Sequence, residues 1–196
     1  MYNVNSIWGK RCSRFDHTAY ICRNNYQPTN IANIPILSED MTEIQIQEAL
    51  ADFQNMQGRQ EIFEQNGYTI IKDCYNAGPE SMAAALAVLG NKPGRHVAVL
   101  GDMLELGVCT QAEHYKVGRI AAEKADVLLS YGPNSVRMLY GAMTGGMSQA
   151  RARAFTARER LVAALKQMAK PGDVILFKGS RGMRMELILE QFLEQT

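Results

Sequence analysis

Residues 79–107 read PESMAAALAVLGNKPGRHVAVLGDMLELG and predict one helix followed by one buried strand. Pro79 suits the first position of a helix, and the apolar stripe that follows it stops at Gly90, a residue that commonly ends helices. The short run from His96 to Leu100 is almost wholly apolar, as expected of a strand covered on both faces. A helix followed by such a strand is the building unit of parallel sheets.

The same alternation continues toward the C-terminus. Helical periodicity predicts helices over residues 111–124, 133–142, 156–169 and 183–193, and short apolar runs predict strands over 127–131, 152–155 and 174–177. Pro133 is expected to open the second of these helices, and Thr156 with Glu159 forms a capping-box signature for the third. Strands separated by helices in this way predict right-handed crossovers and a mostly parallel sheet.

Toward the N-terminus, Asn66-Gly67 joins two runs, 60–65 and 68–75, and is the strongest short signal for a hairpin. We therefore expect an α/β fold of three αβα layers, whose sheet is entered through an antiparallel hairpin. Residues 41–55 show helical spacing, whereas residues 1–39 show no sustained period. The predicted domains are an uninterpreted arm, 1–39, and one α/β domain, 40–196.

Composition excludes several classes of protein. The formal net charge is +1, so there is no unbalanced field to attract nucleic acid or anionic lipid. No apolar run approaches the roughly 20 residues that span a bilayer, and no signal peptide is evident. The four cysteines form no CxxC pair, which argues against a zinc site or a disulfide framework. We expect a cytoplasmic protein with free thiols.

Polar residues directly after the predicted strands are the candidates for a site, because ligands of parallel sheets bind beyond the carboxyl ends of the strands. Four segments qualify: 73–79, 101–107, 131–134 and 178–182. Lys178 and Arg181 would suit a phosphate or a carboxylate. Asp73 would either cap a turn or accept hydrogen bonds from a ribose, and ordinary turn chemistry is the alternative at each segment.

Three further features have plain alternatives. Arg59 follows a glycine near the hairpin and could reach an anion on another surface, or it is an ordinary surface arginine. His114 is expected to be a hydrogen-bonded structural residue of a helix. The methionines near Met138 are expected to be core and loop residues rather than a cofactor-binding site. The sequence has neither GxGxxG after a strand nor GxxxxGK[ST], so it lacks the phosphate loops of NAD-binding and P-loop proteins.

Four segments together resemble the MurF type of Mur ligase, the UDP-N-acetylmuramoyl-tripeptide:D-alanyl-D-alanine ligases. They are IQEALADFQNMQGRQE (46–61), DCYNAGPESM (73–82), VAVLGDMLELG (97–107) and GDVILFKGSRGMRMELIL (172–189). The resemblance runs from about Ile44 to Phe192. It departs from the family's acidic-Asp and Asn-Pro pairs at Lys72-Asp73 and Gly78-Pro79.

The resemblance implies a Rossmann-like C-terminal domain of a three-domain enzyme from peptidoglycan synthesis. That enzyme uses ATP and Mg²⁺, held mainly by a central P-loop domain, to phosphorylate the tripeptide carboxylate. The amine of D-Ala-D-Ala then attacks the acyl phosphate. It further implies that Arg59, Asp73 and Asn76 contact the nucleotide, and that Lys178, Ser180 and Arg181 hold the dipeptide. No residue of this domain is assigned as a catalyst or metal ligand.

Two hypotheses on function remain open from the sequence. In the first, the chain is a ligase domain that is inactive alone and depends on the missing domains, which are either supplied in trans or lost. In the second, it is a noncatalytic module or relic that keeps a nucleotide- or dipeptide-binding rim without turnover. An NAD-dependent enzyme ranks last, because the glycine fingerprint is missing.

Overall fold

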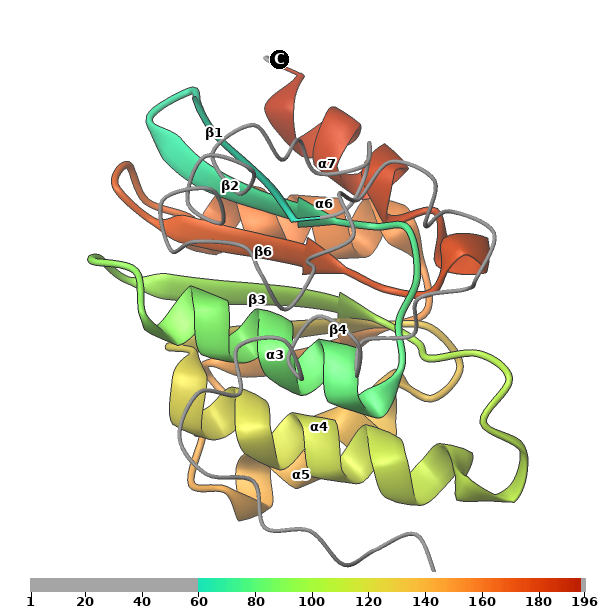
Figure 1. Cartoon of the computed structure of the whole chain (residues 1–196). Helices are drawn as coiled ribbons and strands as arrows, with labels where there is room; N and C mark the ends of the chain where they lie inside the picture. Colours follow the sequence, from blue (N-terminus) through green and yellow to red (C-terminus); the bar gives the residue numbers. More distant parts are fainter. Residues whose placement is uncertain (1–59, 195–196) are drawn as a thin grey trace, which may run out of the picture. The chain divides into compact units, whose positions relative to one another are not determined.

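The computed structural model describes residues 60–194 and shows a sheet flanked by helices on both faces (Figure 1). Its strands are β1 (Glu61–Gln65), β2 (Tyr68–Asp73), β3 (His96–Gly101), β4 (Val127–Tyr131), β5 (Ala152–Phe155) and β6 (Val174–Lys178). Its helices are α3 (Pro79–Gly90), α4 (Thr110–Lys124), α5 (Ser135–Thr144), α6 (Arg158–Met168) and α7 (Met185–Leu193), with short 3-10 turns η2 (Gly107–Cys109) and η3 (Arg181–Met183). The predicted helix 41–55, Arg59 and the boundary between arm and domain lie outside the described residues.

The strand order is β1-β2-β6-β3-β4-β5. Only β1 with β2 is antiparallel, and all the other neighbouring pairs are parallel. The predicted mostly parallel sheet with a hairpin entry is therefore confirmed. At the hairpin, Asn66 and Gly67 both have positive φ, 52° and 79°, as the predicted Asn-Gly turn requires.

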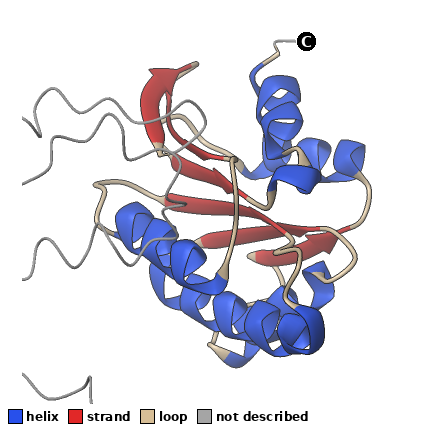
Figure 2. Ribbon diagram, turned by 45° about the vertical axis from the view of Figure 1, so that its right-hand side comes forward, coloured by secondary structure: helices blue, strands red, loops and turns tan. Residues whose placement is uncertain are grey.

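Helices lie on both faces of the sheet (Figure 2), and the core consists of two apolar layers, one on each side of the sheet. Helices α3, α4 and α5 cover one face, where Leu86 and Met138 pack against inward residues such as Leu100. Helices α6 and α7 cover the other face, where Ile188 packs with Val99. Because neighbouring residues of a strand point to opposite faces, the central strands must be apolar throughout, and the predicted three layers are confirmed.

Two predicted helix starts are wrong. Helix α5 begins at Ser135 rather than at Pro133, and its N-cap residue, Asn134, donates its backbone N–H to Asp102 of another loop, 2.9 Å away. Helix α6 begins at Arg158 after Ala157, and no side chain caps it, so the predicted capping box of Thr156 does not form. Within residues 60–194, no helix is long and apolar enough to cross a membrane.

The last helix also begins later than predicted. The segment from Met183 was expected to be helical throughout, but η3 ends there and Arg184 adopts a left-handed conformation with φ 49°. Helix α7 then starts at Met185, whose side chain is fully buried against the sheet. This break holds residues 181–184 at the carboxyl end of β6 instead of inside a helix.

Candidate functional site

The loops that follow β2, β3, β4 and β6 lie at one edge of the sheet, which we call the rim (residues 73–79, 101–107, 131–134 and 178–182). Asp73 is the register partner of Lys178 on the neighbouring strand, and Leu100 pairs with the same lysine from the other side. The candidate segments after β2, β3 and β6, which hold Asp73, Asp102 and Lys178, therefore lie at one edge of the sheet, as expected for parallel strands.

Lys178 and Asp73 form a buried ion pair beneath the rim. Their Nζ and Oδ2 atoms are 2.6 Å apart, and the side chains are 2% and 9% exposed. Lys178 Nζ also donates to the carbonyl oxygen of Asn76, 3.0 Å away. The lysine therefore fixes the loop after β2 from below, and its charge is already neutralised by Asp73.

Ser180 connects three loops of the rim. Its hydroxyl oxygen accepts the N–H of Leu104 at 2.9 Å and donates to the carbonyl of Ala77 at 3.3 Å. Its own N–H donates to the carbonyl of Asp102 at 3.1 Å. Ser180 is 4% exposed, so its polar groups are engaged within the domain.

Asp102 connects the loop after β3 to the loop after β4. One carboxylate oxygen, Oδ2, accepts both the backbone N–H and the side-chain Nδ2 of Asn134, each at 2.9 Å. Gly132 contacts the same carboxylate closely, and a Cβ added at Gly132 would lie 2.6 Å from Asp102 Cγ. The carboxylate also lies at the N-terminus of α5, where negative charge is favourable.

The other oxygen of Asp102, Oδ1, is buried and has no hydrogen-bond partner among the described residues. It lies 3.5 Å from Nε2 of His114, but that nitrogen accepts the N–H of Met103 at 3.0 Å. The other ring nitrogen, Nδ1, is 2.6 Å from the carbonyl of Thr110, so it carries the proton. His114 is thus a fully buried, hydrogen-bonded residue, as predicted.

Two predicted site residues remain accessible at the rim. Arg181 is 70% exposed, and its nearest anion is Glu186 Oε1 at 3.5 Å. Asn76 is exposed, and its Oδ1 accepts the N–H of Ala77, which leaves Nδ2 as the outward donor. The predicted contacts of Arg181 and Asn76 with ligands are compatible with this geometry and stay predictions. Contact of ligand with Asp73, Lys178 or Ser180 would require the buried groups described above to be exposed.

The sequence analysis placed Asp102 and Asn134 in two candidate segments, 101–107 and 131–134, but assigned neither residue a role of its own. Asn134 is partly buried, and because its Nδ2 faces the carboxylate, its Oδ1 is the outward atom. The available signals were an asparagine directly before a helix and an aspartate directly after a buried strand. Neither signal shows that the two residues meet, since they are 32 positions apart.

The two departures from the resembling family have local explanations. Lys72 pairs with Glu61, its register partner in the hairpin, at 3.2 Å, so its charge is used between the strands. Gly78 occupies the N-cap of α3, where the hydroxyl of Ser81 accepts the N–H of Gly78 and donates to its carbonyl. The missing asparagine side chain is thus partly replaced by Ser81.

Cys74 lies directly beside Asp73 but is not a nucleophile. Burial raises the pKa of its thiol to about 12, and the nearby carboxylates of Glu186 and Asp73 act in the same direction. The thiol is 3.6 Å from the carbonyl oxygen of Phe177, to which it can donate. It is therefore a protonated core residue at neutral pH.

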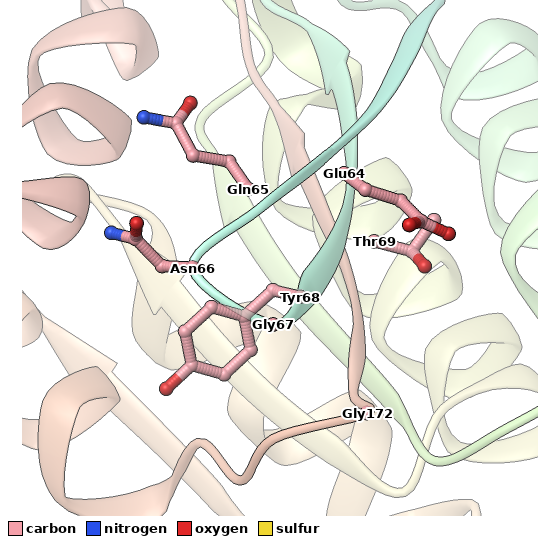
Figure 3. Close-up of a pocket in the computed structure, with 7 residues that line it drawn as sticks. All are labelled: Glu64, Gln65, Asn66, Gly67, Tyr68, Thr69 and Gly172. Atoms are coloured by element: carbon pink, nitrogen blue, oxygen red, sulfur yellow. The ribbon is translucent and has the colours of Figure 1, made fainter.

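A hollow of about 310 Å³ lies at the opposite end of the sheet, around the hairpin turn (Figure 3). Figure 3 shows Gln65 and Asn66 pointing to one side of the hairpin, and Glu64 and Thr69 to the other. The side chains do not converge on a common point, so this hollow is a poor candidate for a binding site. Among residues 60–194, no group of three or more His, Cys, Asp or Glu could hold a metal ion.

A rim at the carboxyl ends of the strands of a mostly parallel sheet places the chain in the class of α/β domains that bind ligands at this edge. Residues 58–181, more than half of the chain, match the family described as "Mur ligase, glutamate ligase domain", and the chain belongs to that family. Within it, the similarity is to the C-terminal domain of MurF, and three relatives illustrate the match.

The UDP-N-acetylmuramoyl-tripeptide–D-alanyl-D-alanine ligase of Bacillus subtilis is 38% identical over 132 residues, which is 66% of this chain and 29% of the relative. A crystal structure of MurF from Acinetobacter baumannii matches with a TM-score of 0.69 at 31% identity, over 79% of this chain and 34% of that one. The MurF ligase of Thermotoga maritima in complex with ADP matches with a TM-score of 0.63 at 30% identity, over 74% and 32%. The chain thus spans about a third of the length of these proteins.

Proposed function

We propose that this chain acts as the C-terminal domain of an ATP-dependent ligase that adds D-Ala-D-Ala to UDP-N-acetylmuramoyl-tripeptide. The Bacillus subtilis relative, 38% identical, bears the name of that ligase. The observation that carries the proposal is the rim: exposed Arg181 stands beside Ser180, which hydrogen bonds fix to two other loops. A fixed support of this kind is what orienting a small substrate requires.

Arg181 is the group we assign to the carboxylate of the dipeptide. A guanidinium matches a carboxylate with two parallel hydrogen bonds, and its only anionic neighbour in the described residues, Glu186, is at the long distance of 3.5 Å. The resemblance implies that Lys178 and Ser180 hold the dipeptide directly. We propose a supporting role for both, because Lys178 neutralises Asp73 and Ser180 anchors the backbone before Arg181.

Asn76 is the group we assign to the nucleotide. Its Oδ1 is held by Ala77, so its Nδ2 points outward as a donor, which suits the oxygen-rich surface of a ribose or phosphate. Asp73 supports this loop through Lys178, which binds the carbonyl of Asn76. The role of Arg59 toward the phosphates remains part of the proposal, by resemblance alone.

ATP and Mg²⁺ do not fit this chain by itself. The sequence has no P-loop, and residues 60–194 have no cluster of metal-ligating side chains. We therefore propose that the triphosphate and the metal are held by a partner domain, supplied in the same protein or in trans. The chain's own residues then orient the dipeptide amine and neutralise its carboxylate, because attack of an amine on an acyl phosphate depends on positioning more than on covalent help.

A graft tests this proposal. Residues 41–196 replace the matching region of the Bacillus subtilis relative, and ligation of UDP-linked tripeptide with D-Ala-D-Ala is measured. We expect partial activity, and Arg181→Ala should raise the KM for the dipeptide about tenfold or more while leaving the KM for ATP unchanged. Arg151→Ala is the matched control, because Arg151 is exposed at the other end of the sheet. If the graft folds but its KM for the dipeptide is unchanged by Arg181→Ala, the proposal is contradicted and a noncatalytic module is favoured.

A further inference from the structure

Asn134 and Asp102 form a pair that the proposed function does not yet use. The carboxylate of Asp102 accepts the backbone N–H and Nδ2 of Asn134, so the orientation of the amide is fixed by chemistry: the nitrogen must face the carboxylate. The amide oxygen Oδ1 is then the atom available to a ligand, since the residue is only partly buried. An oriented acceptor at the rim recognises an N–H donor.

The negative charge of Asp102 strengthens the preference of Asn134 Oδ1 for an N–H donor. Asp102 is fully buried, and its second oxygen has no partner among the described residues. A negative charge that accepts from Nδ2 polarises the amide and makes Oδ1 a better acceptor, because hydrogen bonds in a chain reinforce each other in a low-dielectric interior. A cationic donor, such as a protonated amine, gains most from such an acceptor.

The spacing of the strands matches a dipeptide. The loop of Arg181 follows β6, the loop of Asn134 follows β4, and β3 lies between them. Two strand spacings are roughly 9 to 10 Å, and two extended residues span roughly 7 Å. A dipeptide whose carboxylate is bound by the flexible Arg181 side chain therefore places its amino end near Asn134.

We propose that Asn134 binds the amino group of the incoming dipeptide through Oδ1, and that Asp102 is the positioning residue that orients Asn134. This inference rests on the proposed function, because it takes D-Ala-D-Ala as the ligand. It assigns a recognition contact to the end of the substrate that reacts, whereas Arg181 binds the end that does not.

The test uses the full 196-residue chain, labelled with ¹⁵N, and titration with D-Ala-D-Ala observed by nuclear magnetic resonance. Asn134→Ala is expected to weaken binding about tenfold, the loss typical of one hydrogen bond to a charged group. Asn66→Gly is the matched control, since that asparagine lies in the hairpin turn at the opposite end of the sheet. N-acetyl-D-Ala-D-Ala, which has lost the ammonium group, should bind the wild type and Asn134→Ala equally weakly.

Variants of Asp102 separate positioning from folding. Asp102→Asn should lose less affinity than Asp102→Ala, because its amide oxygen can still accept both bonds from Asn134 although the polarising charge is gone. Asp102→Ala should lose about as much affinity as Asn134→Ala, and the double variant should lose no more, because both substitutions remove the same contact. If Asp102→Ala does not fold, the affinities of Asp102→Asn and Asn134→Ala for D-Ala-D-Ala are compared instead. The inference is overturned if Asp102→Asn binds the dipeptide as weakly as Asn134→Ala or more weakly.

The outcomes distinguish this inference from the proposed function. If Arg181→Ala weakens binding but Asn134→Ala does not, the inference is overturned and the proposed function stands. If the wild-type chain does not bind the dipeptide at millimolar concentration and the graft is insensitive to Arg181→Ala, both are overturned. The inference is supported if Asn134→Ala weakens binding of the free dipeptide, Asn66→Gly does not, and N-acetyl-D-Ala-D-Ala binds the wild type and Asn134→Ala equally weakly.

Discussion

Nζ of Lys178 lies 2.6 Å from Oδ2 of Asp73, at the carboxyl ends of two neighbouring parallel strands. Both side chains are almost completely removed from solvent. Each charge is tolerated there only because the other compensates it, since an isolated buried charge costs several kcal/mol. The pair therefore makes the rim depend on two residues that lie 105 positions apart in the chain.

We predict that Lys178→Met destabilises the domain by about 3 to 5 kcal/mol, because it leaves the Asp73 carboxylate buried without a counter-charge. The free energy of unfolding is measured by urea denaturation. The double variant Lys178→Met with Asp73→Leu removes both charges and should recover much of the loss. If the single and double variants were equally unstable, the ion pair would not be the cause.

Asp102→Asn is predicted to leave the free energy of unfolding unchanged or to raise it by up to about 1 kcal/mol. The amide oxygen can accept both bonds from Asn134, and the new NH₂ group faces Nε2 of His114 in place of the unpartnered oxygen. Asp102→Ala should instead lower the free energy of unfolding by about 1 to 3 kcal/mol, because it removes two hydrogen bonds. Thermal and urea unfolding of the three proteins give the comparison, and a clear loss in Asp102→Asn would show that the charge itself stabilises the fold.

The sequence predicts the sheet and the rim well because their signals are local. Apolar runs such as 174–177 can only be buried strands in this alternation, and Asn66-Gly67 has the backbone preferences that a two-residue hairpin turn requires. The carboxyl ends of parallel strands must then meet at one edge. This is why Asp73 and Lys178 could be placed together without a structure.

The sequence fails where a partner comes from a distant loop. Pro133 is a sound helix start by local rules, but the helix begins at Ser135, and Asn134 before it is bound to Asp102 of another loop. Lys178 after a strand has the features of a ligand-binding cation, and only the structure shows that Asp73 already neutralises it. No local pattern encodes such pairings, so the supporting role of Lys178 could not be predicted.

Because the pKa of the Cys74 thiol is raised in the folded state, we predict that the free energy of unfolding decreases at alkaline pH. Its pKa is raised from 9.0 to about 12 in the folded state, chiefly by burial. Between these values the unfolded chain has lost the thiol proton and the folded chain retains it, so the free energy of unfolding decreases by about 1.4 kcal/mol per pH unit from this group. Below pH 9 the contribution is complete and constant. Because other groups titrate in this range, the measured quantity is the difference between wild type and Cys74→Ala from pH 8 to 11, which should change sign or shrink as the pH rises.

The isolated chain is predicted to hydrolyse no ATP. The sequence contains no P-loop to hold a triphosphate, and the described residues contain no cluster of side chains that could hold Mg²⁺. Phosphate release is measured with ATP, Mg²⁺ and D-Ala-D-Ala against a heat-inactivated control. Release above that control that is abolished by Arg59→Ala would contradict the prediction, since it would place a complete nucleotide site in this chain.

Gly132 and Gly78 form a matched pair for testing how tightly the rim is built. Gly132 has φ +125°, and a Cβ there would lie 2.6 Å from Cγ of Asp102, so Gly132→Ala combines backbone strain with a clash against a buried carboxylate. We expect it to lower the free energy of unfolding by about 1 to 3 kcal/mol and to release Asn134 from Asp102.

Gly78, on the same rim, has φ −133° at the N-cap of α3, and a Cβ would meet nothing within 4 Å. Gly78→Asn should therefore be neutral or stabilising by a few tenths of a kcal/mol, because asparagine is a favourable N-cap residue. Hydrogen exchange of the Asn134 amide separates local from global effects: Gly132→Ala should accelerate it more than exchange in the core strands, and Gly78→Asn should not. Equal acceleration at every amide in Gly132→Ala would mean that the glycine serves only global stability, and that the contact between Gly132 and Asp102 does not hold Asn134 in place.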